Sequence, residues 1–436
     1  FHRLKQKPVK DILFTISKRL PKIIKFKKLE MNSKALEAYV ENSGDFLNKD
    51  SLKYNSVFFF SSEDKNQIRS SYKKIFSESF SSISQTSNLK ELKIFDKTVN
   101  LERINWHSSV DLDGRYWPLS FFSKINYGHF CRKYGDPKYV WELNRHQHFF
   151  VLGRNFLLTN NEEYAELFIR QIETWIEQNP FLYGINWVEG IEVSCRAISW
   201  IWAYSFFKDF KGFDENFTIK FIKNLKLHGD YLVDNLSEHW ETNSNHLLSE
   251  LLGILYLGNF FYEYDFGKEW FNLAASKLED EIQSQIMEDG FTYESSFGYH
   301  KYVTEIFLHC HLLLEFHDKK SLIIKSKLKK MLTALRYICK PDGTIPNYGD
   351  CDDAQVLNFN QNVNNPDFLN FACSKFDEAS FRSHSLPSEY SFWLDTNYSF
   401  NEAKLSKLEE KVFFEKAGLF IFNIYKKNRH ICFIFG

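Results

Sequence analysis

Between residues 137 and 340 the sequence repeats one pattern, an apolar stripe at helical spacing followed by a short polar or glycine-containing turn. Leu247, Leu248, Leu251 and Leu255, for example, recur at the spacing of about 3.6 residues that marks one face of an α-helix. Turn and capping residues separate the stripes, so each stripe predicts one helix. The expected helices span residues 137–157, 161–178, 188–208, 214–234, 244–263, 267–286, 298–316 and 322–339.

Eight consecutive helices with short connections are more than a four-helix bundle holds, and they suit stacked helical hairpins. Such hairpins form either an open solenoid or a closed ring. The sequence shows no repeat of fixed length of the tetratricopeptide or ankyrin kind. Hairpins that diverge because their loops build a central site are typical of an α/α toroid. The sequence therefore predicts a mainly α protein, with an α/α toroid (an incomplete ring of helical hairpins) over residues 101–395.

The two ends of the chain differ from the helical region. The first 28 residues carry ten Lys or Arg against one acidic residue, so we expect residues 1–100 to form a basic arm and a helical lead-in. Near the other end, residues 418–425 and 430–435 are rich in β-branched and aromatic side chains and are joined by a polar turn. Because a lone hairpin is marginally stable, we expect residues 396–436 to be the first strands of an antiparallel β-sandwich domain.

The composition limits the partners and the kinds of site that this chain can have. A formal net charge of −1 gives no overall field to attract nucleic acid, so we expect no such partner. The seven cysteines are scattered, form no CxxC pair, and are expected to be mostly buried thiols. No apolar stretch approaches the roughly 20 residues that span a bilayer. No secretory signal is visible, so localisation stays open: periplasmic or secreted if a leader was removed, and cytoplasmic otherwise.

Four polar segments stand at the starts of expected helices or in the turns between them, at residues 186–196, 243–246, 287–300 and 341–355. The last belongs to residues 340–395, a long connection rich in Asp, Asn and Ser that is expected to carry loops at the mouth of the toroid. In a ring of helical hairpins, alternate helix starts converge on one rim. Residues far apart in sequence can therefore meet there across a central cleft.

Ordinary structural roles would also explain these polar residues. Ser244 or Asn245 can cap the helix that follows, which would leave His246 on the surface of the first turn. Arg196 can pair with Glu192 one turn earlier on the same helix, an interaction worth about 0.2–0.5 kcal/mol. These explanations stay open beside a catalytic one.

The catalytic interpretation takes Asn245, His246 and Tyr299 together as the residues of a β-elimination on a uronic acid. That reaction needs the substrate carboxylate neutralised, the C5 proton removed by a base, and a proton supplied to the departing O4. Asn245 can donate amide hydrogens to the carboxylate. His246, which titrates near neutral pH, can remove a proton or assist the neutralisation. Tyr299, otherwise an ordinary aromatic residue at a helix start, can deliver a proton to the glycosidic oxygen.

Five motifs occur in a consistent order over about residues 100–360. They are GDPKYVWELNRHQHF, INWVEGIEVSCRAISW, NSNHLLSELLGILYL, GFTYESSFGYHKYV and DGTIPNYGDCDDAQV. With these motifs and the β hairpin near residue 430, the chain resembles the heparinase II/III-like polysaccharide lyases. The resemblance implies an α/α toroid followed by an antiparallel β-sandwich, with the substrate in the cleft between them.

The resemblance also implies roles for individual residues. Asn245 matches the carboxylate-neutralising Asn, His246 the adjacent His, and Tyr299 the Tyr that acts as acid and, in some members, as base. The other candidates are expected to line the cleft and bind substrate. These substrate-binding candidates are Arg145, Trp187, Arg196, Glu294 and His300.

The family usually carries a further histidine cluster, His-x-His-x-Asp, in its β-sandwich, and this sequence does not contain one. His430 precedes that position and is expected to be a strand-edge histidine. The histidines are dispersed, and neither HExxH nor CxxC occurs. We therefore expect no metal and no cofactor within this chain, and a metal site in the rest of the β-sandwich stays open.

Two other functions stay open. An inverting glycoside hydrolase on the same toroid would use two opposed carboxylates, for which Glu294 with Asp350 or Asp353 are candidates. A non-catalytic or biosynthetic surface-polysaccharide protein would instead present aromatic platforms. The candidates for these platforms are Trp106, Trp117, Trp141 and Trp187. The expected partner is an acidic polysaccharide, whereas the polymer, the mode of attack and the oligomeric state stay open.

Overall fold

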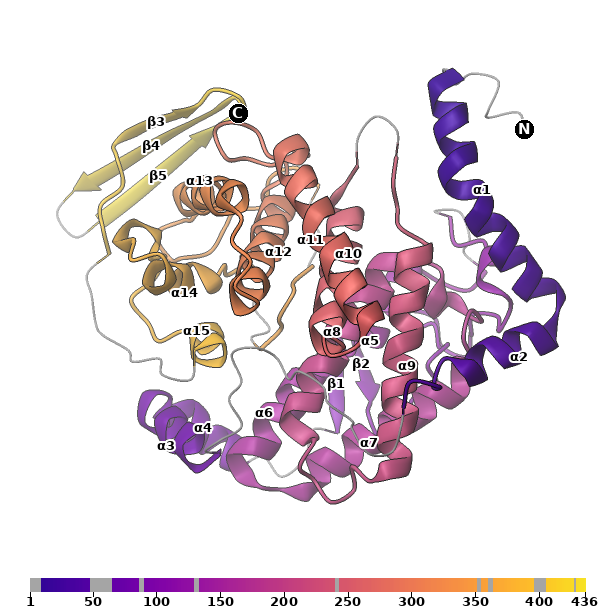
Figure 1. Ribbon diagram of the computed structural model, residues 1–436. Coiled ribbons are helices and arrows are strands. Elements are labelled where there is room, and N and C mark those ends of the chain that lie inside the picture. Colours follow the sequence, from indigo (N-terminus) through magenta and orange to yellow (C-terminus); the bar gives the residue numbers. More distant parts are fainter. Residues whose placement is uncertain are drawn as a thin grey trace.

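The described part of the chain is a body of packed helices with a small antiparallel sheet at one end (Figure 1). The computed structural model describes residues 9–47, 65–85, 90–128, 133–239, 243–350, 354–359, 364–395, 405–426 and 429–436. The mainly α, toroid-like architecture predicted from the sequence is confirmed. None of the helices in these ranges combines the length and the apolar character that a membrane crossing requires.

The helices of the central region follow the predicted stripes closely. Their bounds are α5 Pro137–Asn144, α6 His148–Thr159, α7 Glu162–Gln178, α8 Gly190–Phe207, α9 Glu215–Asp234, α10 Asn245–Phe260, α11 Asp265–Gln285, α12 Phe297–Phe316 and α13 Leu322–Ile338. Side-chain caps fix several starts, since Ser244, Ser296 and Ser321 each accept a hydrogen bond from a backbone N–H in the first turn of the following helix. The capping residues thus stand where the apolar stripes begin, so both signals predict the same helix starts.

The predicted helix 137–157 is wrong in one respect, because it is broken into α5 and α6. His146 adopts a left-handed backbone with φ of 56°, which a continuous helix excludes. Buried contacts stabilise this conformation. Trp200 Nε1 donates a hydrogen bond of 2.8 Å to His146 Nδ1, and Arg145 turns toward two carboxylates. Tertiary contacts therefore override the local preference for a helix.

Helix α10 lies at the centre of the helical body (Figure 1). All of its residues are buried except His246. Glycines allow the close approach of its neighbours: a Cβ built on Gly253 would lie 2.3 Å from Ser194 Oγ of α8, and one on Gly258 would lie 2.5 Å from the Phe271 nitrogen of α11. The position of the start of α10 is consequently set by packing along its whole length.

The N-terminal residues form helices and a hairpin on the outside of this body. Their elements are α1 Val9–Met31, α2 Ser33–Asn42, α3 Lys65–Ile75, α4 Ser77–Gln85, β1 Glu91–Ile94 and β2 Lys97–Asn100. The basic region expected as an arm is therefore helical from Val9. Phe26 and Leu29 of α1 are buried, and Lys25 forms an ion pair with Asp234 at the end of α9.

Residues 340–395, expected to be a connection, also contain two short helices, α14 Phe368–Lys375 and α15 Glu389–Leu394. Of the seven cysteines, Cys195, Cys310, Cys339 and Cys373 are buried thiols, as expected. Cys131 and Cys351 lie outside the described residues. The three-part division of the chain stays a prediction.

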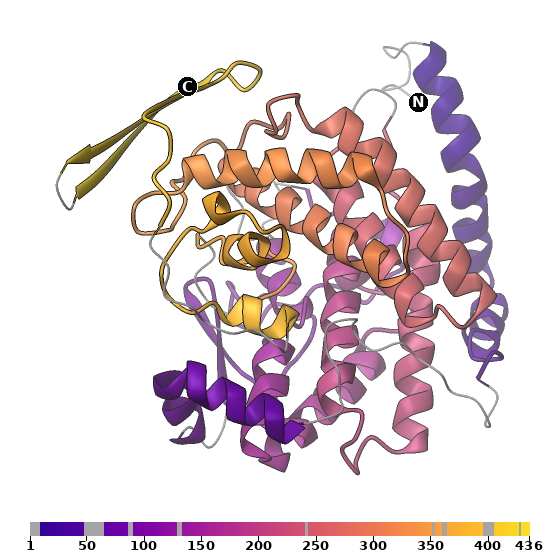
Figure 2. The ribbon, with the colours of Figure 1, turned by 60° about the vertical axis from the view of Figure 1, so that its left-hand side comes forward.

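The C-terminal sheet contains β3 Lys411–Phe414, β4 Leu419–Lys426 and β5 Arg429–Phe435 in antiparallel order. The sequence predicted β4 and β5 and missed β3. Figures 1 and 2 show the sheet on the side of the helical body away from α1. One face packs on the helices through Phe414, Leu419 and Ile421, and the other face is apolar and exposed. The exposed residues are Phe413, Ile424, Ile431, Phe433 and Phe435.

The contact between α8 and α10 gives a test of the packing. We expect Gly253→Ala to lower the free energy of unfolding by about 1–3 kcal/mol, because the new methyl group overlaps Ser194 in a closely packed interface. Thermal or denaturant unfolding followed by circular dichroism measures the change. Gly44→Ala is the control: its new Cβ would have no neighbour nearer than 3.6 Å. Equal stability of the two variants would contradict the packing described for α10.

Candidate active site

The first residue of α10 is held by a carboxylate from another part of the chain. Asn245 is buried, and its backbone N–H donates to Glu294 Oε1 at 2.9 Å while its side-chain Nδ2 donates to Glu294 Oε2 at 2.8 Å. The backbone donor is one of those that a helix start leaves without an intrahelical partner. Charge-assisted hydrogen bonds of this kind are strong and directional. Glu294 therefore fixes the orientation of the Asn245 amide.

Glu294 belongs to the loop between α11 and α12. This loop contacts the start of α10 and then leads into the start of α12. The Tyr293 hydroxyl donates to the carbonyl of Asn243 in the approach to α10. Three residues later Ser296 caps α12, and the N–H of Tyr299 donates to Ser296 Oγ at 3.3 Å. Tyr299 thus lies in the first turn of α12, half-buried, and its hydroxyl donates to Asp350 Oδ2 at 3.1 Å.

His246 projects from the same turn of α10 as Asn245. Its Nδ1 lies 3.7 Å from Glu189 Oε2, and the other oxygen of Glu189 accepts a hydrogen bond from the Tyr127 hydroxyl. The interaction with the Glu189 carboxylate raises the pKa of His246, although partial burial acts in the opposite direction. Burial alone would raise the pKa of Glu189, but its bonds with His246 and Tyr127 outweigh that effect and lower the pKa. Both shifts favour an imidazolium paired with a carboxylate.

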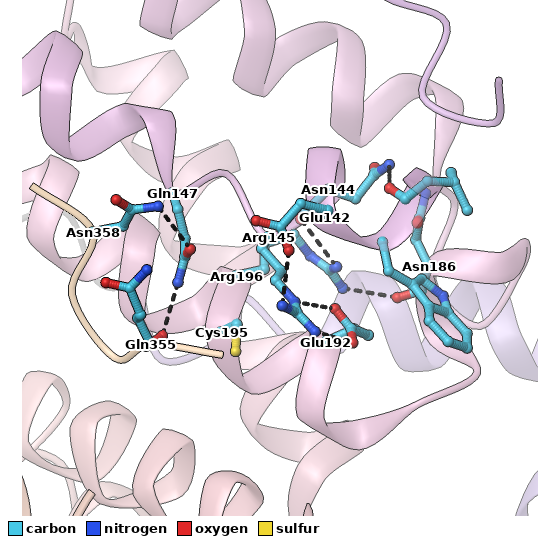
Figure 3. Close-up of polar contacts among 12 residues, drawn as sticks. Glu142, Asn144, Arg145, Gln147, Asn186, Glu192, Cys195, Arg196, Gln355 and Asn358 are labelled. Carbon is cyan, nitrogen blue, oxygen red and sulfur yellow. Dashed lines mark hydrogen bonds and ion pairs between the residues drawn. The ribbon is translucent and has the colours of Figure 1, made fainter. Parts of the chain in front are cut away.

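Arg145 is held in a nearly buried ion pair at the break between α5 and α6 (Figure 3). Its Nε and Nη2 donate to Glu192 of α8 at 2.7 and 2.9 Å, and its Nη1 donates to Glu142 at 2.8 Å. Burial would lower the pKa of Arg145, but the two carboxylates outweigh it and raise the pKa. Glu192 therefore pairs with Arg145, and the alternative left open by the sequence, a Glu192–Arg196 pair, does not form.

Arg196 lies in the core of the protein. It is 0% exposed, its guanidinium carbon lies 4.4 Å from the ring centre of Trp175, and its Nε donates to His228 Nε2 at 2.8 Å. Its remaining nitrogens donate to the backbone carbonyls of Asn144 and Asn186 (Figure 3). Burial without a direct carboxylate partner lowers the pKa of Arg196 to about 9. Arg196 therefore links three parts of the core by hydrogen bonds: α5, the segment before α8, and α9.

Trp187 and His300 are buried as well. Trp187 is 0% exposed and packs against Trp175 and His228. His300 is also 0% exposed, faces the Met331 carbonyl of α13 at 3.3 Å, and has a pKa lowered to about 4 by burial. In this structure neither side chain offers a surface to a substrate. The buried positions of Trp187, Arg196 and His300 therefore give no support to the substrate-binding role predicted for them.

A small polar cavity is found on another part of α12. Its lining includes Lys301, Glu305, Gln355 and Tyr390, and its volume of about 20 Å³ is close to that of one or two water positions. It is too small for a sugar ring. Among the residues that the structure describes, no three His, Cys, Asp or Glu side chains gather as metal ligands.

A comparison with family models identifies the architecture. The model described as heparinase II/III N-terminus matches residues 25–371 of the 436-residue chain. The chain belongs to the heparinase II/III family. The start of α10, the loop around Glu294 and the first turn of α12 all fall inside the matched region.

The chain is also similar, at low sequence identity, to curated heparin-sulfate lyases. The chain is 25% identical over 263 residues to a heparin-sulfate lyase of Bacteroides stercoris, which covers 55% of this chain and 37% of that protein. It is 28% identical over 252 residues to a heparin-sulfate lyase of Pedobacter heparinus, with 55% and 35% covered. The chain thus spans about a third of the length of these relatives.

Solved structures show the same fold. A crystal structure of a heparan sulfate lyase mutant from Pedobacter heparinus matches 94% of this chain and 58% of that chain, with a TM-score of 0.52 and 19% identity. A crystal structure of heparinase III matches 84% and 58%, also with a TM-score of 0.52, at 18% identity. At this identity the likeness supports the fold alone.

The structure gathers part of the predicted site and adds residues to it. Asn245, His246, Glu294 and Tyr299 lie at two helix starts joined by one loop, and Arg145 lies near the start of α8. Glu189 and Tyr127 were not predicted. The expected helix 188–208 placed Glu189 inside its first turn, so the sequence offered no capping signal for Glu189. The candidate platforms Trp106, Trp117 and Trp141 are buried, and Asp353 lies outside the described residues.

The Arg145 ion pair supports a stability prediction for this heparinase II/III family member. We expect Glu192→Gln to lower the free energy of unfolding by about 2–4 kcal/mol, because it removes a bidentate partner from a nearly buried guanidinium. The matched control is Glu142→Gln, which removes the charge that Arg145 Nη1 contacts, on a carboxylate that is 20% exposed, at a cost of about 1 kcal/mol or less. Denaturant unfolding of both variants measures the difference, and a larger loss for Glu142→Gln would contradict this assignment.

Proposed function

We propose that this protein is a polysaccharide lyase that cleaves a uronic-acid-containing polysaccharide by β-elimination. The observation that carries the proposal is the arrangement at the start of α10. There an amide fixed by Glu294 and an imidazole paired with Glu189 stand side by side, and the loop that holds the amide leads directly to Tyr299.

The Asn245 and His246 pair is suited to bind the carboxylate of a uronate. The Asn245 amide has two hydrogens on Nδ2, and Glu294 accepts one of them, so the other is available to a ligand. His246 is 46% exposed and can donate a second, charge-assisted hydrogen bond. As the C5 proton leaves, negative charge builds up on the carboxylate, and both donors then stabilise the transition state more than the ground state.

Tyr299 is suited to the proton transfers. A phenol can accept the C5 proton as its phenolate, or deliver a proton to the departing O4. Asp350 accepts the hydrogen bond of the Tyr299 hydroxyl at 3.1 Å and orients it at the rim. The heparin-sulfate lyases that this chain resembles are named for an acidic polysaccharide, which supports a uronate polymer as the substrate class.

The two alternative functions are less well supported. Both oxygens of Glu294 already accept hydrogen bonds from Asn245, so Glu294 is poorly placed to act as the protonated acid of an inverting hydrolase. Trp106, Trp117, Trp141 and Trp187 are all buried, so they do not form a stacking surface for a non-catalytic binding protein.

The first test of the proposal is the chemical nature of the product. With a panel of uronate polymers, we expect a product that absorbs in the ultraviolet because elimination leaves a C4–C5 double bond conjugated to the carboxylate. Hydrolysis leaves no such bond. Tyr299→Phe should abolish this absorbance, since the proton carrier is lost. Tyr337→Phe is the control and should retain it, because the Tyr337 hydroxyl of α13 accepts a hydrogen bond from the Glu409 backbone. Full turnover by Tyr299→Phe would refute the central role of this residue.

The second test concerns the carboxylate. We expect Asn245→Ala to lower kcat by roughly 100-fold or more, the usual cost of one preorganised donor. Initial rates at saturating substrate, with circular dichroism to verify folding, measure the loss. An unchanged kcat in a folded Asn245→Ala variant would show that the carboxylate is neutralised elsewhere.

A further inference from the structure

Glu189 is the N-cap residue of α8, yet its side chain makes no capping hydrogen bond to that helix. Helix caps are usually Ser, Thr, Asp or Asn, whose short side chains reach the first free N–H groups. The Glu189 carboxylate instead contacts two side chains from other parts of the chain, the Tyr127 hydroxyl on Oε1 and the His246 ring near Oε2. Capping therefore does not account for a Glu at this position.

The Glu189 carboxylate lies between the other two side chains, and Tyr127 and Glu189 are both partly buried. Tyr127 packs edge-on against the ring of Trp141, with 5.5 Å between the ring centres. The Glu189 side chain is 19% exposed, and the His246 side chain is 46% exposed. Tyr127 thus holds one oxygen of the carboxylate by a hydrogen bond, and the imidazole is more exposed than the carboxylate beside it.

The charged groups around His246 come from three packed elements. Besides Glu189, which precedes α8, Glu192 of α8 and Glu250 of α10 both favour the charged imidazole. Glu192 is held by Arg145, and Glu250 accepts hydrogen bonds from the backbone and side chain of Ser237. Glu189 is nearest to the ring and contributes most to the raised pKa.

We propose that Glu189, anchored by Tyr127, is a positioning residue that keeps His246 protonated and oriented, so that His246 binds the uronate carboxylate as a cation and does not act as the base. This inference rests on the proposed lyase function. Because Nδ1 faces Glu189 at 3.7 Å, the proposal assigns the Nε2–H of the imidazolium to the substrate. A protonated ring cannot accept the C5 proton, which assigns that step to Tyr299 as its phenolate. The hydroxyl proton of Tyr299 passes first to Asp350, its acceptor at 3.1 Å, and the C5 proton taken up by Tyr299 is then available to the departing O4.

A direct test follows the titration of His246 by NMR, with its ring signal identified by its loss in His246→Asn. We expect Glu189→Gln to move the His246 titration to lower pH, because the amide keeps the acceptor for Tyr127 but removes the negative charge. Glu215→Gln is the matched control, since it removes an exposed carboxylate at the start of α9 and should leave the titration unchanged. An unchanged titration in Glu189→Gln would overturn the inference.

The pH dependence of turnover tests the role of this pair in the reaction. If the protonated ring is the active form, activity falls as pH rises through the pKa of His246. A lower pKa in Glu189→Gln then moves this fall to lower pH, with a loss in kcat of about tenfold at neutral pH. Glu189→Asp retains the charge and should restore the alkaline limb, whereas a purely structural role would give equal profiles in both variants and overturn the assignment.

The two proposals fail in distinguishable ways. If no uronate polymer yields an unsaturated product with the parent protein, the lyase function fails. The NMR titration is measured without substrate and still decides whether Glu189 controls His246. If the product forms but Glu189→Gln has the parent pH profile, the lyase function stands and the role given to Glu189 is wrong.

Discussion

The contact between Glu294 and Asn245 is the constraint on which the candidate site depends. One carboxylate accepts both the backbone and the side-chain N–H of the first residue of α10, and the loop that carries it continues into the cap of α12. Two helix starts that are 54 residues apart in sequence, at Asn245 and Tyr299, are thereby joined through one short segment. Without this contact the amide would be free to rotate, and the helix start would lose a charge-assisted acceptor.

The helical body makes that constraint rigid. Every residue of α10 but His246 is buried, and Gly253 and Gly258 bring α8 and α11 close to its backbone. The polar residues at its start therefore cannot move without moving the core. Two carboxylates, Glu294 and Glu189, contact Asn245 and His246, the proposed donors to the substrate. Folding therefore supplies the free energy that orders these side chains, so binding a substrate need not. This is the physical basis of preorganised catalysis.

Much of the fold could be predicted from the sequence, because helical periodicity and Ser or Asp caps act locally. The break at His146 could not, since it depends on Trp200 and on the Arg145 ion pair. Within the candidate site, Asn245, His246 and Tyr299 were predicted through the motifs and stay a prediction. Asn245 contacts the loop that precedes α12, the helix of Tyr299. Arg196 and His300 are buried in helices α8 and α12, which are buried on nearly all sides, so helical spacing does not show which of their polar residues face a cleft. Glu189 escaped notice because its partners are distant in sequence.

The central claim is that Asn245 and His246 bind a uronate carboxylate. A crystal structure of the Tyr299→Phe variant with a uronate oligosaccharide tests it most directly. The account predicts the carboxylate of the sugar at the cleavage position within hydrogen-bonding distance of Asn245 Nδ2 and the His246 ring, with its O4 facing residue 299. A carboxylate bound elsewhere, with these two side chains free of the sugar, would contradict the account.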